Sequence, residues 1–156
     1  IPLSQTCLEI QGRPVALEPG SGGVGAARRY SEMPETGGRL GKLAAYEIDT
    51  MEELWSREQR SPFLTSSLTT AGGLVFAGDA DRYYRAFDIQ TGDVLWETRL
   101  GAAAHGYPIT YEAGGRQFIA VPASHGGVLR SLSAQLNPEV YLPEGGNALY
   151  VFALPE

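Results

Sequence analysis

The sequence predicts an all-β fold, and within that class part of a β-propeller built from four-stranded antiparallel blades. The segment Ala45–Trp55 reads AYEIDTMEELW and the segment Ala86–Trp96 reads AFDIQTGDVLW, so one motif recurs at an offset of 41 residues. A repeat of about 40–45 residues is typical of propeller blades. The 156 residues include 20 Gly and 10 Pro, which suits many short strands joined by turns.

The repeated motif predicts a strand, a turn and a second strand. In the second copy, side chains alternate along Ala86–Ile89 as they do in a strand. Gln90–Asp93 then forms a turn in which Gly92 can take a positive φ. The tryptophan that ends each copy, Trp96 here, supplies a large surface for packing between neighbouring blades. In the first copy Met51 replaces the turn glycine, so we expect that turn to be less regular.

The repeat predicts one complete blade and parts of two others. The complete blade runs from Leu68 to Arg99, with strands near 66–70, 74–78, 83–88 and 94–99. The next blade is expected at 107–111, 117–122 and 148–154, and the preceding one at 3–10, 42–48 and 54–57. Two long irregular loops, 11–40 and 124–146, interrupt them. Residues 1–156 therefore form an incomplete domain of about two to two and a half blades.

Two weaker internal sequence similarities support this assignment. Residues 71–77 (AGGLVFA) are similar to residues 114–120 (GGRQFIA), each a turn that leads into an apolar strand. Residues 149–154 are similar to residues 84–89. These two similarities extend the repeated pattern into the third blade.

Composition excludes several partners. The net charge is −6, and no run of Lys or Arg is longer than two residues. Nucleic acid is therefore not an expected partner, because phosphate binding needs a concentrated basic surface. No apolar stretch reaches the roughly 18–20 residues that a membrane-spanning helix needs. Hydrophobic residues make up 43% of the chain and charged residues 19%, which favours a folded domain over a disordered one.

Several longer segments resemble the C-terminal part of dehydrogenases that depend on pyrroloquinoline quinone (PQQ) and oxidise alcohols. The segments that carry this resemblance are LTTAGGLVFAGD at 68–79, RYYRAFD at 82–88, TGDVLWE at 91–97, GYPITY at 106–111 and GGNALYVFALP at 145–155. The resemblance implies an eight-bladed propeller with PQQ on its axis beside a Ca²⁺ ion. It also implies a periplasmic enzyme in which hydride passes from an alcohol to the quinone and electrons leave to a cytochrome c.

The same resemblance places the catalytic base and most Ca²⁺ ligands in upstream blades. No catalytic or metal-binding residue is therefore assigned to this chain. We interpret it as a fragment that starts at Ile1 and expect it to be inactive alone. We expect it to need the remainder of the propeller, or other copies of itself, for stability.

Five residues are implied to line the cofactor site by alignment with the family. Ser4 stands where the family has an asparagine, and Thr65 and Ser66 lie where some members have a tryptophan near the cofactor. Gly126 and Gly127 align with a glycine pair that a tryptophan follows in methanol-oxidising members. Both tryptophans are absent, which argues against methanol as the substrate.

Other polar residues are given structural roles. Asp79 and Asp81 lie in GDADR between two expected strands, where acidic residues favour turns. His105 and His125 lack metal-ligand spacing and are read as surface histidines. Cys7, the single cysteine, is read as a small buried hydrophobic residue.

An alternative function is a non-catalytic propeller that acts as an assembly scaffold in the bacterial envelope. Such scaffolds share the Ala-x-Asp…Gly…Trp repeat, because that repeat is structural. The segments PITYEAGGRQFIAV at 108–121 and GGNALYVFALPE at 145–156 are similar to the enzymes instead. The sequence therefore favours the enzyme.

Overall fold

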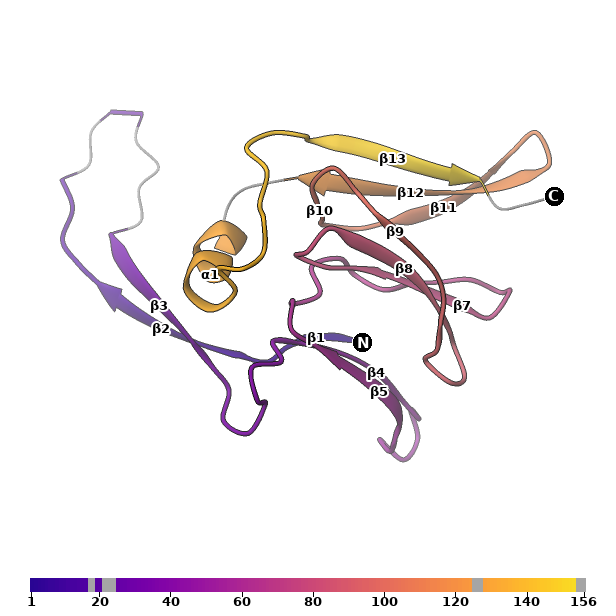
Figure 1. Ribbon diagram of the computed structural model, residues 1–156, viewed down its shortest axis with the longest axis horizontal. Coiled ribbons are helices and arrows are strands. Elements are labelled where there is room, and N and C mark those ends of the chain that lie inside the picture. Colours follow the sequence, from indigo (N-terminus) through magenta and orange to yellow (C-terminus); the bar gives the residue numbers. More distant parts are fainter. Residues whose placement is uncertain (17–18, 21–24, 125–127, 154–156) are drawn as a thin grey trace.

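A computed structural model of the chain describes residues 1–16, 19–20, 25–124 and 128–153. It confirms the all-β prediction: antiparallel sheets stack side by side, and a two-stranded arm projects from one end (Figure 1). We call the three stacked sheets blade 1, blade 2 and blade 3 in chain order.

Blade 2 is the complete blade that the repeat predicts. Its four strands are hydrogen-bonded in chain order and antiparallel. They are β6 (Leu68–Thr69), β7 (Leu74–Gly78), β8 (Tyr83–Asp88) and β9 (Val94–Arg99). The last three strands have the bounds that the sequence predicted, because turns flank each of them on both sides.

Blades 1 and 3 each add further strands. Blade 1 consists of β1 (Pro2–Ser4), β4 (Gly41–Tyr46) and β5 (Glu53–Gln59), in the order β1-β4-β5. In blade 3, β12 pairs with all the other strands. The strands of blade 3 are β10 (Ala103–Ala104), β11 (Ile109–Ala113), β12 (Arg116–Ser124) and β13 (Ala148–Ala153).

The strand expected at 3–10 is divided, which corrects the sequence prediction. Only Pro2–Ser4 pairs with β4 in blade 1. The following β2 (Thr6–Gly12) leaves the blade and pairs along its whole length with β3 (Ala26–Glu32). The change of direction occurs at Gln5, whose backbone N–H donates to the carbonyl of Leu40 at 2.8 Å.

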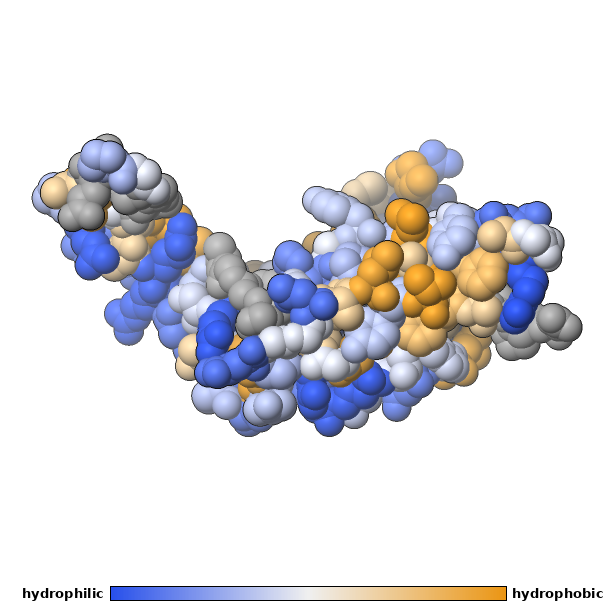
Figure 2. Space-filling model, turned by 90° about the horizontal axis from the view of Figure 1, so that it is seen from above, coloured by the Kyte–Doolittle hydropathy of each residue, from blue (hydrophilic) through white to orange (hydrophobic). Residues whose placement is uncertain are grey.

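The first long loop, 11–40, is therefore not irregular as predicted. Its strand β3 and the end of β2 form the arm that extends away from the blades (Figures 1 and 2). Most side chains of both strands are exposed, so the sequence AARRYSE of β3 shows no alternation of polar and apolar residues. Cys7 lies exposed on β2, and its prediction as a buried residue was wrong.

The second long loop, 124–146, contains a helix that the sequence reading did not predict. This helix, α1 (Val128–Leu136), packs against β3. The backbone N–H of Tyr30 donates to Gln135 Oε1 at 3.1 Å and joins the two elements. Within the described ranges, no helix is both long and apolar enough to cross a membrane.

The two copies of the sequence repeat have the same backbone. The N–H of Met51 donates to the carbonyl of Glu47 at 2.8 Å, and the N–H of Gly92 donates to the carbonyl of Asp88 at 2.9 Å. Met51 has a φ of 59° and Gly92 a φ of 72°. The turn at Met51 is thus as regular as its counterpart, contrary to expectation, and Met51 accepts a left-handed conformation that costs about 1–2 kcal/mol.

The hydrophobic core lies between the blades. Blades 1 and 2 bury Leu43, Phe63, Val75, Ala77 and Phe87 between them, with Trp55 packed against this cluster. Blades 2 and 3 bury a second cluster around Tyr84, Ile119 and Val121. Trp96 contacts Tyr84 and Phe152 there, so the predicted role of both tryptophans in packing between blades is confirmed.

Residues 71–77 and 114–120 do occupy equivalent strands, but the structural alignment of the two segments differs by one residue from the sequence alignment. Val75 pairs with Phe87 in blade 2, and Ile119 pairs with Phe152 in blade 3. Ile119 is therefore the counterpart of Val75, whereas the sequence comparison aligned it with Phe76. A shift of one residue moves a strand's side chains to the opposite face, so the correction decides which residues face blade 2.

One face of blade 3 is apolar and left uncovered by the parts of the chain that the structure describes. Cross-strand pairing places Ile109, Ala120 and Val151 on the same face, with Pro122 and Leu149 beside them. Ile109 is 57% exposed and Leu149 66% exposed. Figure 2 shows hydrophobic side chains gathered on the side of the molecule that carries β13. An apolar sheet face of this kind is typical of one that another layer covers.

Candidate functional site

A cavity of about 410 Å³ lies where the three blades meet. Its wall consists of residues 2–4 from blade 1, residues 63–66 before the first strand of blade 2, and residues 105–107 before β11 of blade 3. Ser4, Thr65 and Ser66 were predicted from the family alignment, and the structure brings all three together here. The volume lies within the range of about 300–1,000 Å³ that is typical of small-molecule sites.

Two of the three wall segments are joined through their backbones. The N–H of Ser66 donates to the carbonyl of Gly106 at 2.9 Å, and the N–H of Gly106 donates to the carbonyl of Leu64 at 3.3 Å. Thr65 and Gly106 form a parallel β-bridge. These two segments are 41 residues apart in the sequence, so blades 2 and 3 supply equivalent segments, before β6 and before β11, to the same cavity.

Thr65 has a structural role in this wall. Its side chain is buried, and Oγ1 accepts a hydrogen bond from the N–H of Gly78 at 2.8 Å. Gly78 itself allows a close approach, since a Cβ there would lie 2.3 Å from the Cβ of Ala104. The Thr65 hydroxyl therefore holds the wall segment against β7 and the start of blade 3.

Ser4 and Ser66 present hydroxyl groups at the cavity. Ser4 is exposed, and its Oγ lies 2.9 Å from Thr6 Oγ1. Ser66 is half-buried and fixed through its backbone. Hydroxyl groups donate hydrogen bonds to carbonyl and carboxylate oxygens, the polar groups that PQQ carries. The donors present fit part of such a cofactor, and the assignment of these residues to cofactor binding stays a prediction.

Two polar residues of this wall, His105 and Tyr107, were not predicted from the sequence. His105 was read as a surface residue, and it is exposed, but it lies at the cavity beside Gly106 and Tyr107. The 41-residue offset carried the signal, because it relates Leu64–Ser66 to His105–Tyr107. Gly126, Gly127 and His125 lie outside the described residues.

The acidic residues of GDADR lie in a turn, as predicted. Asp79 is buried and accepts hydrogen bonds from Arg85 Nη1 at 2.6 Å, Gln59 Nε2 at 3.0 Å and the N–H of Tyr83 at 3.0 Å. Burial raises the pKa of Asp79, although the neighbouring Arg85 opposes that shift. Because Gln59 belongs to blade 1, Asp79 helps to join the first two blades. Nowhere in the described part of the chain do three or more His, Cys, Asp or Glu side chains gather as a metal site.

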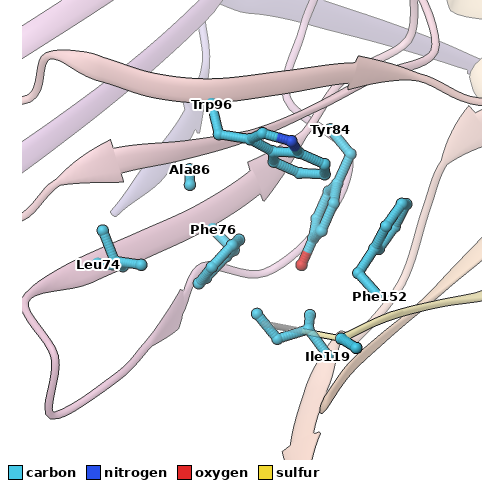
Figure 3. A pocket seen from close by; sticks show the side chains of 8 residues that line it. Leu74, Phe76, Tyr84, Ala86, Trp96, Ile119 and Phe152 are labelled. Atoms are coloured by element: carbon cyan, nitrogen blue, oxygen red, sulfur yellow. The ribbon is translucent and has the colours of Figure 1, made fainter. Parts of the chain in front are cut away.

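A second cavity, of about 400 Å³, lies between blades 2 and 3 (Figure 3). Apolar and aromatic side chains line it, including Phe76, Trp96 and Phe152. The hydroxyl of Tyr84 is buried here and has no hydrogen-bond partner among the residues that the structure describes. The cavity is continuous with the core between the blades, so we assign it to blade packing.

The comparison with protein families identifies the fold. A PQQ family model, described as the β-propeller domain of glucose/ethanol/alcohol dehydrogenases, matches residues 33–119. The matched region is more than half of the chain and includes blade 2 and most of blade 1. The chain belongs to this family of PQQ-dependent (quinoprotein) alcohol dehydrogenase propellers.

Individual relatives agree with this assignment. Quinoprotein alcohol dehydrogenase PedH of Pseudomonas putida is 28% identical over 156 residues, which are all of this chain and 26% of the relative. Methanol dehydrogenase [cytochrome c] subunit 1 of Methylobacterium organophilum is 40% identical over 88 residues, 56% of this chain and 14% of the relative. The chain thus spans about a quarter of the length of curated relatives that match it throughout.

A solved structure confirms the propeller architecture. A europium-containing methanol dehydrogenase superposes with a TM-score of 0.75 at 29% identity, over 99% of this chain and 30% of that chain. The similarity to methanol dehydrogenases does not test the substrate, so the expectation about methanol stays a prediction.

Proposed function

We propose that these residues form the C-terminal blades of a PQQ-dependent dehydrogenase that oxidises alcohols. The observation that carries the proposal is the cavity to which all three blades contribute, through residues 2–4, 63–66 and 105–107. Family membership supplies the class of chemistry. The cofactor would carry the redox step, and the protein would bind and orient it.

Ser4, Ser66, His105 and Tyr107 would hold PQQ through hydrogen bonds to its oxygen atoms. When bound, the quinone accepts hydride equivalents from the alcohol. The wall segments 2–4, 63–66 and 105–107 contain no Lys or Arg. Positive charge that balances the carboxylates of the cofactor would therefore come from other blades, in agreement with a site that several blades share.

The proposal includes a metal ion beside the cofactor. Ca²⁺ suits an oxygen-rich site with carboxylate ligands. A trivalent lanthanide is the second candidate, because the solved relative is named as containing europium. The ligands would belong to the part of the polypeptide that precedes these residues.

Cytochrome c is the proposed electron acceptor, and the periplasm the proposed location. One relative is named as a cytochrome c-linked enzyme, which supports the first of these proposals. The uncovered face of blade 3 supports a further proposal, namely that the remainder of the propeller packs against this face. In that arrangement the 156 residues alone would be inactive and would self-associate through the same face.

The test is a dye-coupled dehydrogenase assay on the full-length polypeptide that carries these residues. The apoprotein would be supplied with PQQ and either Ca²⁺ or Eu³⁺ and offered a panel of primary and secondary alcohols. Turnover that requires PQQ and one of the two metals is the expected result. A folded protein with neither turnover nor PQQ binding would contradict the proposal and favour the envelope scaffold.

A further inference from the structure

Arg60 connects the two long insertions of the fold. It follows directly after β5. Its Nε donates to Glu139 Oε1 at 2.6 Å, and its Nη1 donates to Glu32 Oε1 at 3.2 Å and to the carbonyl of Gly38 at 2.6 Å. Its Nη2 donates to the carbonyl of Leu136, at the end of α1. One guanidinium group thus meets four acceptors, two from each insertion.

The residue after Arg60 is held by the same helix end. Asn137 is fully buried, and its Nδ2 donates to Ser61 Oγ at 2.9 Å. The N–H of Asn137 donates to the carbonyl of Ser133 and so continues the helical hydrogen bonding. Residues 60 and 61 are therefore attached to α1 at two adjacent points.

One wall of the cavity begins immediately after this attachment. Ser61, Pro62 and Phe63 are all buried, and they lead directly into the wall segment 63–66. Gly41 lets this segment approach β4, because a Cβ there would lie 2.4 Å from the carbonyl oxygen of Ser61. The segment is short and closely packed, so its position depends on where residues 60 and 61 are held.

The cavity wall at Ser4 is also connected to Arg60, through the first insertion. Gln5, the next residue, donates from its N–H to the carbonyl of Leu40 at 2.8 Å and from Nε2 to the carbonyl of Arg39 at 3.0 Å. Its own carbonyl accepts from the N–H of Met33 at 3.2 Å. These three bonds tie Gln5 to the base of the first insertion, the part that Arg60 binds at Glu32 and Gly38.

We propose that Arg60 is a positioning residue for the cavity, which holds the walls at Ser4 and Ser66 in fixed relation through the two insertions. Arg60 does not line the cavity, so it acts through other residues. The planar guanidinium can satisfy four acceptors at once, whereas a lysine ammonium has only three donors and no fixed plane. The identity of the ligand rests on the proposed function, but the positioning itself does not.

Amide hydrogen exchange on the full-length protein tests the positioning. The variants are Arg60→Ala, Arg60→Lys and, as a matched control, Arg39→Ala, which removes a single exposed ion pair with Glu58. In both Arg60 variants we expect exchange in peptides that cover residues 2–5 and 62–66 to rise about tenfold, since exchange reports local opening. The control should match the wild type. Wild-type exchange at both walls in Arg60→Ala or in Arg60→Lys would overturn the proposal.

A binding measurement separates positioning from general stability. For Arg60→Lys we expect the Kd for PQQ to rise about tenfold while kcat at saturating PQQ stays within about twofold of wild type, as for other residues that support a site indirectly. An unchanged Kd despite faster exchange at the walls would overturn the positioning role. If the wild-type protein does not bind PQQ, the proposed function fails, and the exchange experiment alone still decides whether Arg60 holds the walls.

Discussion

Trp55 in blade 1 donates a hydrogen bond from its indole Nε1 to the carbonyl of Ile89 in blade 2, at 2.9 Å. The ring of Trp55 also packs on Gly92, where a Cβ would lie 2.5 Å from the ring atom Cε3. Arg57 donates to the carbonyl of Gly92 at 2.9 Å and pairs with Asp93. Strand β5 of blade 1 therefore binds the turn of blade 2 through Trp55 and Arg57. This contact explains why the repeat contains both a glycine and a tryptophan.

Gly92→Ala should destabilise the protein by about 1–3 kcal/mol. The new Cβ would enter the space of the Trp55 ring, and the φ of 72° is unfavourable for alanine. We expect a lower thermal midpoint in the full-length protein. A midpoint equal to that of the wild type would show that the contact between Trp55 and the turn does not hold the blades together.

Met51→Gly should have the opposite effect at the equivalent turn. Met51 has a φ of 59°, and its side chain is 70% exposed, so its replacement removes strain and loses little burial. We expect a gain of about 0.5–1 kcal/mol after the backbone entropy of glycine is counted. Thermal unfolding of the Met51→Gly and Gly92→Ala variants, measured under the same conditions, tests both predictions. A loss of stability in Met51→Gly would contradict the equivalence of the two turns.

Tyr84→Phe should leave stability unchanged or raise it by about 1 kcal/mol, because the wild-type hydroxyl is buried in apolar surroundings without a described partner. The same burial raises the pKa of the Tyr84 phenol above its usual range. Tyr150→Phe is the control, since the Tyr150 hydroxyl accepts from the N–H of Gly101 at 2.9 Å and its removal should cost about 1 kcal/mol. Equal losses in the two variants would argue that the Tyr84 hydroxyl has a partner.

Glu53 should make stability depend on acid pH. Hydrogen bonds from Lys42, Ser56 and Tyr46 lower the pKa of Glu53 from 4.5 to about 2. The folded pKa lies below the unfolded one, so the carboxylate stabilises the fold above pH 4.5, and this contribution is lost as the pH falls toward 2. Glu53→Gln should therefore lower the thermal midpoint at pH 7 and differ progressively less from wild type at acid pH. A difference that is constant with pH would contradict this, and Glu52→Gln at the neighbouring position is the control.

The repeat made blade 2 predictable from the sequence. The turn around Gly92 marked the end of β8 and the start of β9, and the alternation along Ala86–Ile89 indicated the faces of β8. Strand β3 could not be found in this way, because it pairs only with β2 and Tyr30 is the one buried residue among its seven. Helix α1 did have a signal, since Leu129, Leu132 and Leu136 recur at helical spacing.

The candidate site was predictable only in part. The resemblance to the family implied Ser4, Thr65 and Ser66 as residues of the cofactor site, and the structure places all three at one cavity. Their convergence needed the fold, since Ser4 is far from the other two in the sequence. The 41-residue offset could have predicted His105 and Tyr107, because it relates these residues to Leu64 and Ser66.

Ser66→Ala combined with Tyr107→Phe should weaken PQQ binding by about tenfold or more, since each change removes one donor from the cavity wall. Equilibrium titration of the full-length apoprotein measures this effect. Thr110→Val, on β11 outside the cavity wall, serves as the control and should bind as the wild type does. Unaltered affinity in the double variant would remove these two residues from the proposed site.

The most direct measurement of the central claim is titration of the full-length apoprotein with PQQ in the presence of Ca²⁺ or Eu³⁺, followed by protein fluorescence. The account predicts saturable binding with a Kd at or below about 1 μM, typical of small-molecule sites with well-placed polar groups. A folded protein that shows no saturable binding with either metal would contradict the account and leave the repeat as blade architecture alone.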